Sequence, residues 1–214
     1  MTQHPFELYD IDSLFTDEQL SIRDAVREFV SDNIRPNIAE WFESGDLPAR
    51  ELALELEAGD SGIRSLVSVQ GSLAMYAIWK FGSEEQKQQW LPRMARGEVI
   101  GCFGLTESDA GSNPSQMRTT AKRDGSDWIL NGTKMWITNG NIADLAIVWA
   151  KTEAGTQGFI VPTDTPGFKA NLIKHKMSLR ASVTSELVFN NVRLPQNAVL
   201  PEVSSMRGPL SCLN

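Results

Sequence analysis

Four short segments carry residue types and spacings that could do chemistry. The first spans residues 101–113 and reads G-C-F-G-L-T-E-S-D-A-G-S-N, so a short apolar run leads into a turn rich in Gly, Ser and Asp. Exposed backbone N–H groups and small hydroxyls in such a loop suit carbonyl and phosphate oxygens. Most loops of this composition are only turns, so this segment alone identifies no ligand.

The second segment, residues 131–139, reads N-G-T-K-M-W-I-T-N. On an extended strand Trp136 and Thr138 have the same side-chain parity, and Ile137 lies on the other face. An indole beside a hydroxyl can stack on a flat ring while the hydroxyl bonds a ring heteroatom. The alternative is a core Trp in a β-sandwich, and the segment taken alone favours that alternative.

The third segment, residues 57–72, reads E-A-G-D-S-G-I-R-S-L-V-S-V-Q-G-S. Arg64, Ser68 and Ser72 fall on one face of a helix, beside its apolar face. For a lone Arg the ordinary interpretation is a solvated ion pair, here with Asp60 four residues earlier. The fourth segment, residues 174–182, is a basic cluster K-H-K-M-S-L-R-A-S, and such clusters are usually solvated surface.

The elements that must position these segments change character near residue 98. Before it, apolar positions recur every three or four residues over 20–34 and 63–81, as on one face of a helix. One capping-box pattern precedes the run over 20–34, and another precedes a shorter helical stretch that follows residue 83. Pro ends the first of these stretches, and Pro and Gly end the second. These signals are Thr16-x-x-Gln19, Ser83-x-x-Gln86, Pro36, Pro92 and Gly97.

From Val99 onward the chain has strand-length runs between Gly, Pro and Asn clusters. Asn131-Gly132, between DWIL and TKMWIT, is the strongest short-range hairpin signal, and the runs DLAIVWAKT, GFIVPT and ELVFNNVRLP follow. The sequence therefore predicts a multidomain α+β chain. An all-α domain over 1–98 precedes a β-sandwich or barrel-like middle domain over 99–203, and residues 204–214 begin a further element.

Composition limits the class of protein. The 214 residues carry a formal net charge of -7, which gives no indication of nucleic acid or of an anionic membrane as partner. No apolar run approaches the roughly 18 to 20 residues of a membrane helix. Two Cys without CxxC spacing and two isolated His indicate neither a disulfide framework nor a metal site. The polar, acidic N-terminus resembles neither a secretory signal nor a transit peptide, so we expect a bacterial cytoplasmic protein.

Taken together, the first two segments are specific. F-G-L-T-E-x-x-x-G-S followed by L-N-G-T-K-x-W-I-T-N resembles the middle domain of the acyl-CoA dehydrogenase family. The resemblance implies FAD as cofactor, with the first segment at the pyrimidine end of the flavin and the W-I-T strand against the isoalloxazine. Ser112 is implied near both the flavin and the pantetheine arm, although Asn113 replaces the acidic residue usual after it. The implied flavin contacts are Phe103, Leu105, Thr106, Ser112, Trp136, Ile137 and Thr138.

The other two segments bear on the substrate. R-S-x-x-S-V-Q-x-S-L resembles the glutaryl-CoA dehydrogenase type, which implies that Arg64 and Ser65 reach the distal carboxylate of a dicarboxylyl thioester. A planar guanidinium suits that task because it can bind a carboxylate bidentately. The segment K-x-S-L-R-A-S resembles the family's acyl-CoA-binding segment and implies Arg180, with Ser178 beside it.

The resemblance implies an activity. An acyl-CoA thioester would undergo FAD-dependent α,β-dehydrogenation, and the glutaryl type also loses carbon dioxide to give crotonyl-CoA, a step of lysine and tryptophan degradation. Electrons would leave through an electron-transfer flavoprotein, and the intact enzyme would be a homo-oligomer. Two alternatives stay open: a dehydrogenase of another short-chain acyl-CoA, and a non-catalytic remnant that binds flavin or a partner.

The sequence also departs from the family pattern. The family's catalytic glutamate lies in a C-terminal helical bundle that this sequence does not contain, so we expect no catalytic base here, and Glu107 in the flavin loop is not used as one. The N-terminal domain is apparently shortened near residues 53–54. We therefore expect the chain alone to bind flavin weakly and to turn over little or nothing.

Overall fold

The computed structural model describes residues 61–213 and, nearer the N-terminus, residues 16, 17, 20, 21, 24, 27, 28, 30–34, 36, 37 and 40. Five residues of the predicted helix over 20–34, and Gln19 of its capping box, lie outside the described residues, while residues 20, 21, 24, 27 and 28 are helical. The part that is described includes a π-helical segment, η3 (Val30–Ile34), and a turn at Pro36.

The predicted helix over 63–81 is confirmed, but its middle is not α-helical. α4 (Ser61–Ser68) continues into the π-helix η4 (Val69–Met75) and then into α5 (Tyr76–Phe81). Seven π-helical residues are unusual, since π-turns are rare and concentrate at functional sites. No sequence pattern predicted this segment.

The next helix, α6 (Glu84–Ala95), begins at the predicted capping box. Ser83 Oγ accepts a hydrogen bond from Gln86 N at 3.3 Å, and Ser83 N donates to Gln86 Oε1 at 2.9 Å. The prediction that Pro92 closes this segment is wrong, because α6 runs through it. Pro92 and Gln88 are both exposed, so water can bond the carbonyl that lacks an N–H partner. Gly97 does lie just beyond the helix, with φ +68°.

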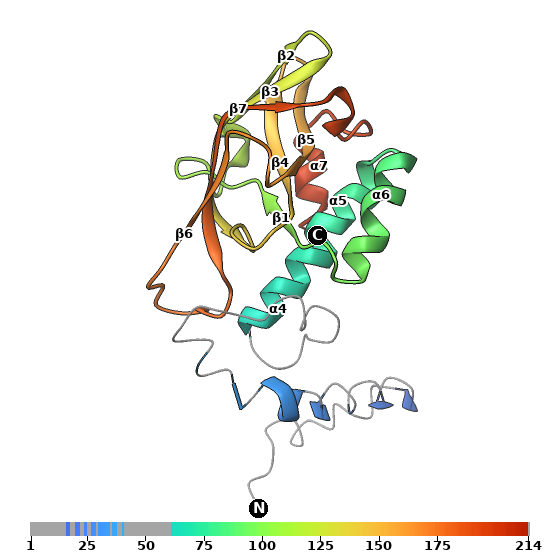
Figure 1. The fold of residues 1–214 in the computed structure, drawn as a ribbon, viewed down its shortest axis with the longest axis vertical. Helices are drawn as coiled ribbons and strands as arrows, with labels where there is room; N and C mark the ends of the chain where they lie inside the picture. Colours follow the sequence, from blue (N-terminus) through green and yellow to red (C-terminus); the bar gives the residue numbers. More distant parts are fainter. Residues whose placement is uncertain are drawn as a thin grey trace, which may run out of the picture.

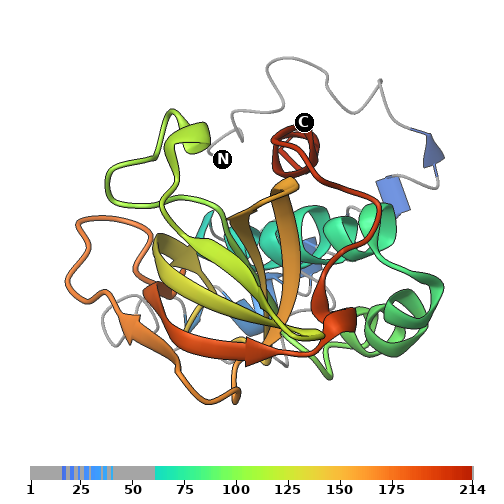
Figure 2. The same ribbon diagram turned by 90° about the horizontal axis from the view of Figure 1, so that it is seen from above.

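The strands form one curled, mixed sheet in the order β1-β4-β2-β3-β7-β6, with β5 pairing β4. β1 and β2 pair β4 in parallel, and the remaining pairs are antiparallel. Figure 2 shows the sheet curling round on itself, which confirms the predicted order of a helical part and a barrel-like β part. The strands are β1 (Gly101–Gly104), β2 (Thr120–Asp124), β3 (Asp127–Thr138), β4 (Leu145–Thr152), β5 (Gly155–Pro162), β6 (Phe168–Leu172) and β7 (Thr184–Leu194).

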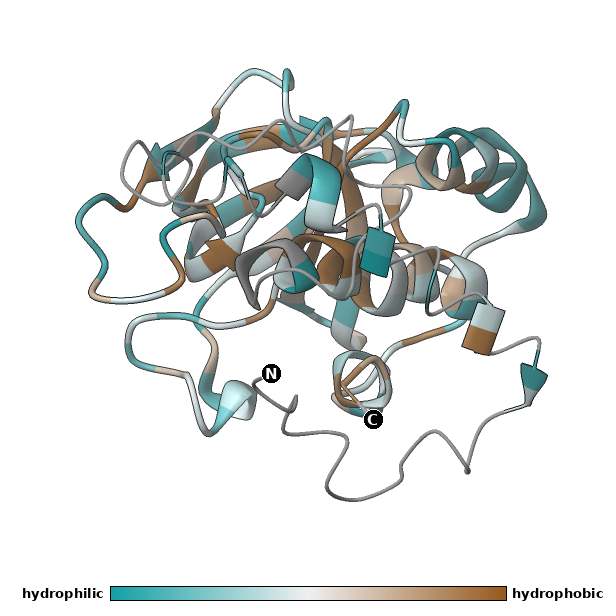
Figure 3. Ribbon diagram, turned by 90° about the horizontal axis from the view of Figure 1, so that it is seen from below, coloured by the Kyte–Doolittle hydropathy of each residue, from teal (hydrophilic) through white to brown (hydrophobic). Residues whose placement is uncertain are grey.

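The helices pack on one side of this sheet (Figure 1). β4 is buried on both faces: Leu145, Ile147 and Trp149 join the helices in one apolar cluster, while Ala146 and Val148 join the cluster inside the curl. Figure 3 shows the apolar colouring concentrated along these inner strands and helix faces. Three short helices complete the described chain: η5 (Pro114–Gln116), η6 (Gln196–Ala198) and α7 (Arg207–Ser211).

The hairpin predicted at Asn131-Gly132 is wrong. β3 runs straight through these residues, and the β2–β3 turn lies at Gly125-Ser126. Gly132 instead marks a bulge, with φ +142° and a shift in the β3–β7 register. A Cβ there would lie 2.5 Å from Thr119 Oγ1, so glycine lets the strand pass close to Thr119. The Asn131 side chain bonds Asn191 on β7 rather than capping a turn.

Candidate functional site

A cleft of about 530 Å³ opens where three parts of the chain meet. α4 contributes one residue, the end of β3 contributes two, and the segment from the end of β6 to the start of β7 contributes the rest. This volume lies within the range of ligand pockets. The lining residues are Ser65, Trp136, Thr138, Ile173, Lys174, His175, Lys176, Met177, Ser178, Leu179, Ser182 and Thr184.

The cleft differs in charge from the chain as a whole. Among the described residues its lining includes Lys174, His175 and Lys176 and no carboxylate, although the chain has a net charge of -7. A concave, positively charged site on an acidic protein attracts anionic ligands selectively. The predicted basic cluster is therefore part of a cleft rather than plain solvated surface.

Trp136 presents its indole to this cleft. The side chain is 60% exposed, so the alternative of a core Trp is wrong. Its φ is +63°, and the β3–β7 register shifts between Lys134 and Ile137. The bulge turns Trp136 outward while Ile137 enters the core, and Thr138 lines the cleft as its parity predicted.

The segment 173–184 is held in shape by its own polar contacts. Lys176 Nζ donates to Ser182 O and, at 2.6 Å, to Thr184 Oγ1, while Arg180 Nε donates to Lys176 O at 2.7 Å. Partial burial lowers the pKa of Lys176. Arg180 itself does not line the cleft; its guanidinium braces the loop that does.

Backbone strain is concentrated here. Among the described residues, five that are not glycine have a positive φ, and three of them, Trp136, His175 and Leu179, line the cleft. A positive φ is uncommon for a bulky side chain and persists only where the surrounding structure imposes it. Such residues gather at binding sites, which supports a functional role for this cleft.

The predicted flavin loop lies beside the cleft, not in its lining. The side chains of Phe103 and Leu105 are buried in the core, so only their backbone is available to a ligand. Thr106 O accepts a hydrogen bond from Met135 N at 2.8 Å, which places Thr106 next to the strand segment that carries Trp136. Ser112 lies on an exposed loop and is not brought into the cleft.

Of the two residues predicted to bind the distal carboxylate, only Ser65 lines the cleft. Ser65 lines the cleft, whereas Arg64 is exposed and Asp60, its suggested ion-pair partner, lies outside the described residues. The helix that carries Ser65 is attached to the sheet by Gln70. Its Nε2 donates to Met94 O at 3.1 Å and Val99 O at 2.8 Å, and its Oε1 accepts from Gly101 N at 2.7 Å.

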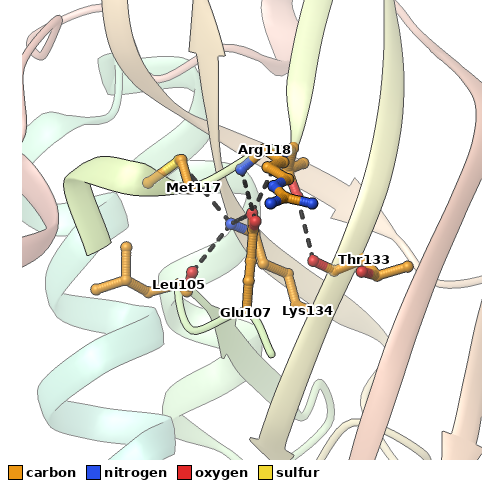
Figure 4. A network of polar contacts seen from close by, with 7 residues as sticks. Leu105, Glu107, Met117, Arg118, Thr133 and Lys134 are labelled. Atoms are coloured by element: carbon orange, nitrogen blue, oxygen red, sulfur yellow. Dashed lines mark hydrogen bonds and ion pairs between the residues drawn. The ribbon is translucent and has the colours of Figure 1, made fainter. Parts of the chain in front are cut away.

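A buried ion pair supports the flavin loop from behind, and no sequence pattern indicated it. Lys134 Nζ lies 2.9 Å from Glu107 Oε1, and both side chains are buried (Figure 4). Strict alternation would have put Lys134 on the side of Trp136, but the bulge between them reverses its direction. The lining residues Ser182 and Thr184 were missed as well, because small hydroxyl side chains carry no distinctive signal.

The donor set fits a flat, anionic cofactor better than a metal. No group of three His, Cys, Asp or Glu within the described part of the chain could hold a metal ion. An exposed indole, a neighbouring hydroxyl and two lysines offer a stacking surface, a hydrogen bond and charge compensation. None of the described helices is long and apolar enough to cross a membrane.

The described chain thus consists of a curled sheet with helices on one side and a basic cleft that carries an exposed tryptophan. The family model for "Acyl-CoA dehydrogenase, middle domain" matches residues 102–192, and that for "Acyl-CoA dehydrogenase, N-terminal domain" matches residues 16–54 and 51–98. The chain belongs to the acyl-CoA dehydrogenase family, whose members are oxidoreductases that use FAD.

Individual proteins similar to this chain belong to the same family. The mitochondrial short-chain specific acyl-CoA dehydrogenase of Rattus norvegicus is 40% identical over 163 residues, covering 73% of this chain and 40% of the relative. A crystal structure of glutaryl-CoA dehydrogenase from Mycobacterium smegmatis is 59% identical, with TM-score 0.92, covering 96% of this chain and 61% of that one. A second, in complex with FADH2, is 55% identical with TM-score 0.94, covering 100% and 63%. The chain thus spans less than two thirds of each of these proteins.

Proposed function

We propose that this chain provides the flavin- and acyl-CoA-binding part of a FAD-dependent glutaryl-CoA dehydrogenase. In the intact enzyme, glutaryl-CoA would undergo oxidative decarboxylation to crotonyl-CoA. The observation that carries the proposal is the cleft itself, which is lined by Ser65 of α4, by Trp136 and Thr138 of β3 and by a basic loop. The identities of 55 and 59% to glutaryl-CoA dehydrogenase structures support the choice of substrate.

The flavin would lie against the Trp136 side of the cleft. Trp136 would stack on the isoalloxazine, the Thr138 hydroxyl would bond it, and the backbone of Phe103, Leu105 and Thr106 would hold the pyrimidine end. Ile137 and Ser112 would complete the contact. FAD, when bound, supplies the acceptor for the hydride that leaves the β carbon of the substrate. The chain's own residues bind and orient both partners of that transfer.

The thioester would enter from the side of α4. Arg64 and Ser65 would bind the distal carboxylate of the substrate, because Arg64 is exposed next to the cleft-lining Ser65. Lys174 and Lys176 would attract the phosphates of CoA, and Arg180 and Ser178 would keep the loop in place or contact the ligand directly.

The described residues offer no free carboxylate to act as base at this cleft. Glu107 lies in the flavin loop, and its two oxygens already accept hydrogen bonds from Lys134 Nζ, Arg118 N and Thr119 N. Asp109, in the same loop, pairs with Arg118. We therefore infer that the chain alone binds ligands but does not turn over. The intact enzyme would act in a bacterial cytoplasm as a homo-oligomer and pass electrons to an electron-transfer flavoprotein; the mycobacterial relatives support a bacterial source.

Comparison of two thioesters tests the proposal. Glutaryl-CoA and butyryl-CoA should be titrated separately into the FAD-loaded chain, its Arg64→Ala variant and the control Arg207→Ala, whose side chain is also exposed. Loss of a charge-assisted bond of about 1.5–3 kcal/mol predicts that Arg64→Ala weakens glutaryl-CoA binding roughly ten- to a hundredfold. Butyryl-CoA binding should not change. Equal losses for both ligands, or none, would favour a different short-chain acyl-CoA.

A further inference from the structure

The two segments that we expect to contact the flavin lie on different elements, and hydrogen bonds join them at two points. One is the hydrogen bond from Met135 N to Thr106 O at 2.8 Å. The other is made by the side chain of Lys134, whose Nζ donates to Leu105 O at 3.0 Å and to Glu107 Oε1 at 2.9 Å. Figure 4 shows Lys134 reaching from β3 into the turn after β1. The ammonium group therefore fixes the spacing between these two segments.

Lys134 is an unusual lysine. Its side chain is 0% exposed, whereas lysines are almost never fully buried unless paired. Its three N–H donors have three acceptors, since Met117 Sδ lies 3.9 Å from Nζ in addition to Leu105 O and Glu107 Oε1. Gly104 makes room for the stem, because a Cβ there would lie 3.3 Å from Lys134 Cγ.

Glu107 is held as firmly as its partner. Its Oε2 accepts from Arg118 N at 2.6 Å, and its Oε1 accepts from Thr119 N at 3.0 Å as well as from Lys134. Burial raises the pKa of this carboxyl, but these hydrogen bonds outweigh burial and leave the pKa below its ordinary value. The carboxylate thus stays ionised and closes the loop between β1 and β2 onto Lys134.

The pair also lies at the point where β3 changes direction. The register against β7 shifts after Lys134, so the Lys134 side chain enters the core and Trp136, two residues later, faces the cleft. Lys134 and the hydrogen bond from Met135 N to Thr106 O together set the position of the indole relative to the Leu105–Glu107 turn.

We propose that Lys134 and Glu107 are positioning residues of the flavin site, which hold the Leu105–Thr106 backbone at a fixed spacing from Trp136 and place two compensating buried charges behind it. The inference rests on the proposed function, because it assumes that a flavin lies between these segments.

Charge compensation gives a readout that simple loss of packing would not produce. Lys134→Met leaves a buried negative charge behind the flavin site, which disfavours the added electrons and shifts the midpoint potential of bound FAD downward. Glu107→Gln leaves a buried positive charge and shifts it upward. The double variant Lys134→Met/Glu107→Gln has no net charge at the site and should return the potential towards the wild-type value. It also guards against failure of either single variant to fold.

The experiment uses the 214-residue chain with and without FAD. Binding of FAD is measured by titration, the potential of bound FAD by reduction against a reference dye, and local opening by hydrogen exchange without FAD. The control is Lys169→Met, which removes an exposed strand lysine. We expect at least tenfold weaker FAD binding in Lys134→Met, faster exchange confined to residues 103–107 and 134–138 in both single variants, and opposite potential shifts. The control should match wild type in each.

Failure of this inference is distinguishable from failure of the proposed function. If wild type binds FAD but the two single variants shift the potential in the same direction or not at all, the positioning pair is overturned and the flavin site stands. If wild type does not bind FAD, the proposed function fails for this chain. Hydrogen exchange without FAD then tests the role of Lys134 and Glu107. Faster exchange limited to the two segments in the variants supports that role, and uniform or unchanged exchange overturns it.

Discussion

Replacing Gln70 by Met removes three hydrogen bonds that attach the cleft-bearing helix to the sheet. The Gln70 side chain is 5% exposed and lies in the π-helical segment η4. Its amide bonds the end of α6, the carbonyl of Val99 and the first N–H of β1, at 2.7 to 3.1 Å. Met has nearly the same length and fills the same space, so the change isolates the polar contacts from packing.

The cost can be worked out bond by bond. A typical hydrogen bond contributes about 1 kcal/mol net, and a buried group left without a partner costs about 1–3 kcal/mol. Gly101 N is buried and loses its acceptor, while the two carbonyls lose a shared donor. We therefore expect the free energy of unfolding to fall by about 3 kcal/mol.

Urea denaturation followed by circular dichroism measures this loss. The midpoint should fall while the slope m stays constant, because the surface exposed on unfolding does not change. Gln88→Met is the matched control, since Gln88 is exposed on α6 and its replacement should stay within about 0.5 kcal/mol. A loss below about 1 kcal/mol in Gln70→Met would refute the reasoning, because it would mean that the bonds are readily replaced.

Two further predictions concern the strand that carries Trp136. Burial lowers the pKa of Lys134 to about 8 although Glu107 opposes this. Above pH 8 the folded chain therefore releases a proton that the unfolded chain keeps up to its ordinary pKa of 10.5, so Lys134 adds stability as the pH rises through that window. Burial raises the pKa of Cys102 and Cys212, which lowers stability above pH 9, so the test is made below that pH. Urea midpoints measured from pH 7 to 9 should rise more in wild type than in Lys134→Met, in which, among the described lysines, only Lys176 keeps a lowered pKa. Gly132→Ala should cost about 2–4 kcal/mol, because its Cβ would collide with Thr119 at φ +142°. Gly71→Ala, which meets nothing within 4 Å in a helix, should instead stabilise by about 0.5–1 kcal/mol in the same assay, and a similar loss in both would count against the steric argument.

Much of the fold followed from local patterns. The apolar repeat over 63–81 and the Ser83-x-x-Gln86 box each depend on neighbours within one turn, and both predicted helices exist. The strands β4, β5 and β7 could be predicted equally well, because their sequences are apolar and bounded by Gly, Pro and Asn. Asn131-Gly132 misled, since the same dipeptide that favours a tight turn also suits a bulge. Only the distant residue Thr119 decides between them.

The candidate site was predictable only in part. Trp136, Thr138 and Ser65 were chosen from motifs and do line one cleft. Arg64 and Ser112 do not appear in its lining, and the flavin contacts assigned to Phe103 and Leu105 can involve only their backbone. The Lys134–Glu107 pair joins residues 27 apart, and its direction depends on a bulge, so no local pattern could have revealed it.

Fluorescence titration of FAD with the chain tests the central claim most directly. Stacking on Trp136 should quench the flavin emission in a saturable way, and Trp136→Ala should abolish most of that quenching. Trp79→Ala provides the comparison, because Trp79 is 57% exposed, close to the 60% of Trp136, but lies on α5 away from the cleft lining. The account predicts normal quenching in Trp79→Ala. Quenching that is absent in wild type, or that survives Trp136→Ala unchanged, would contradict it.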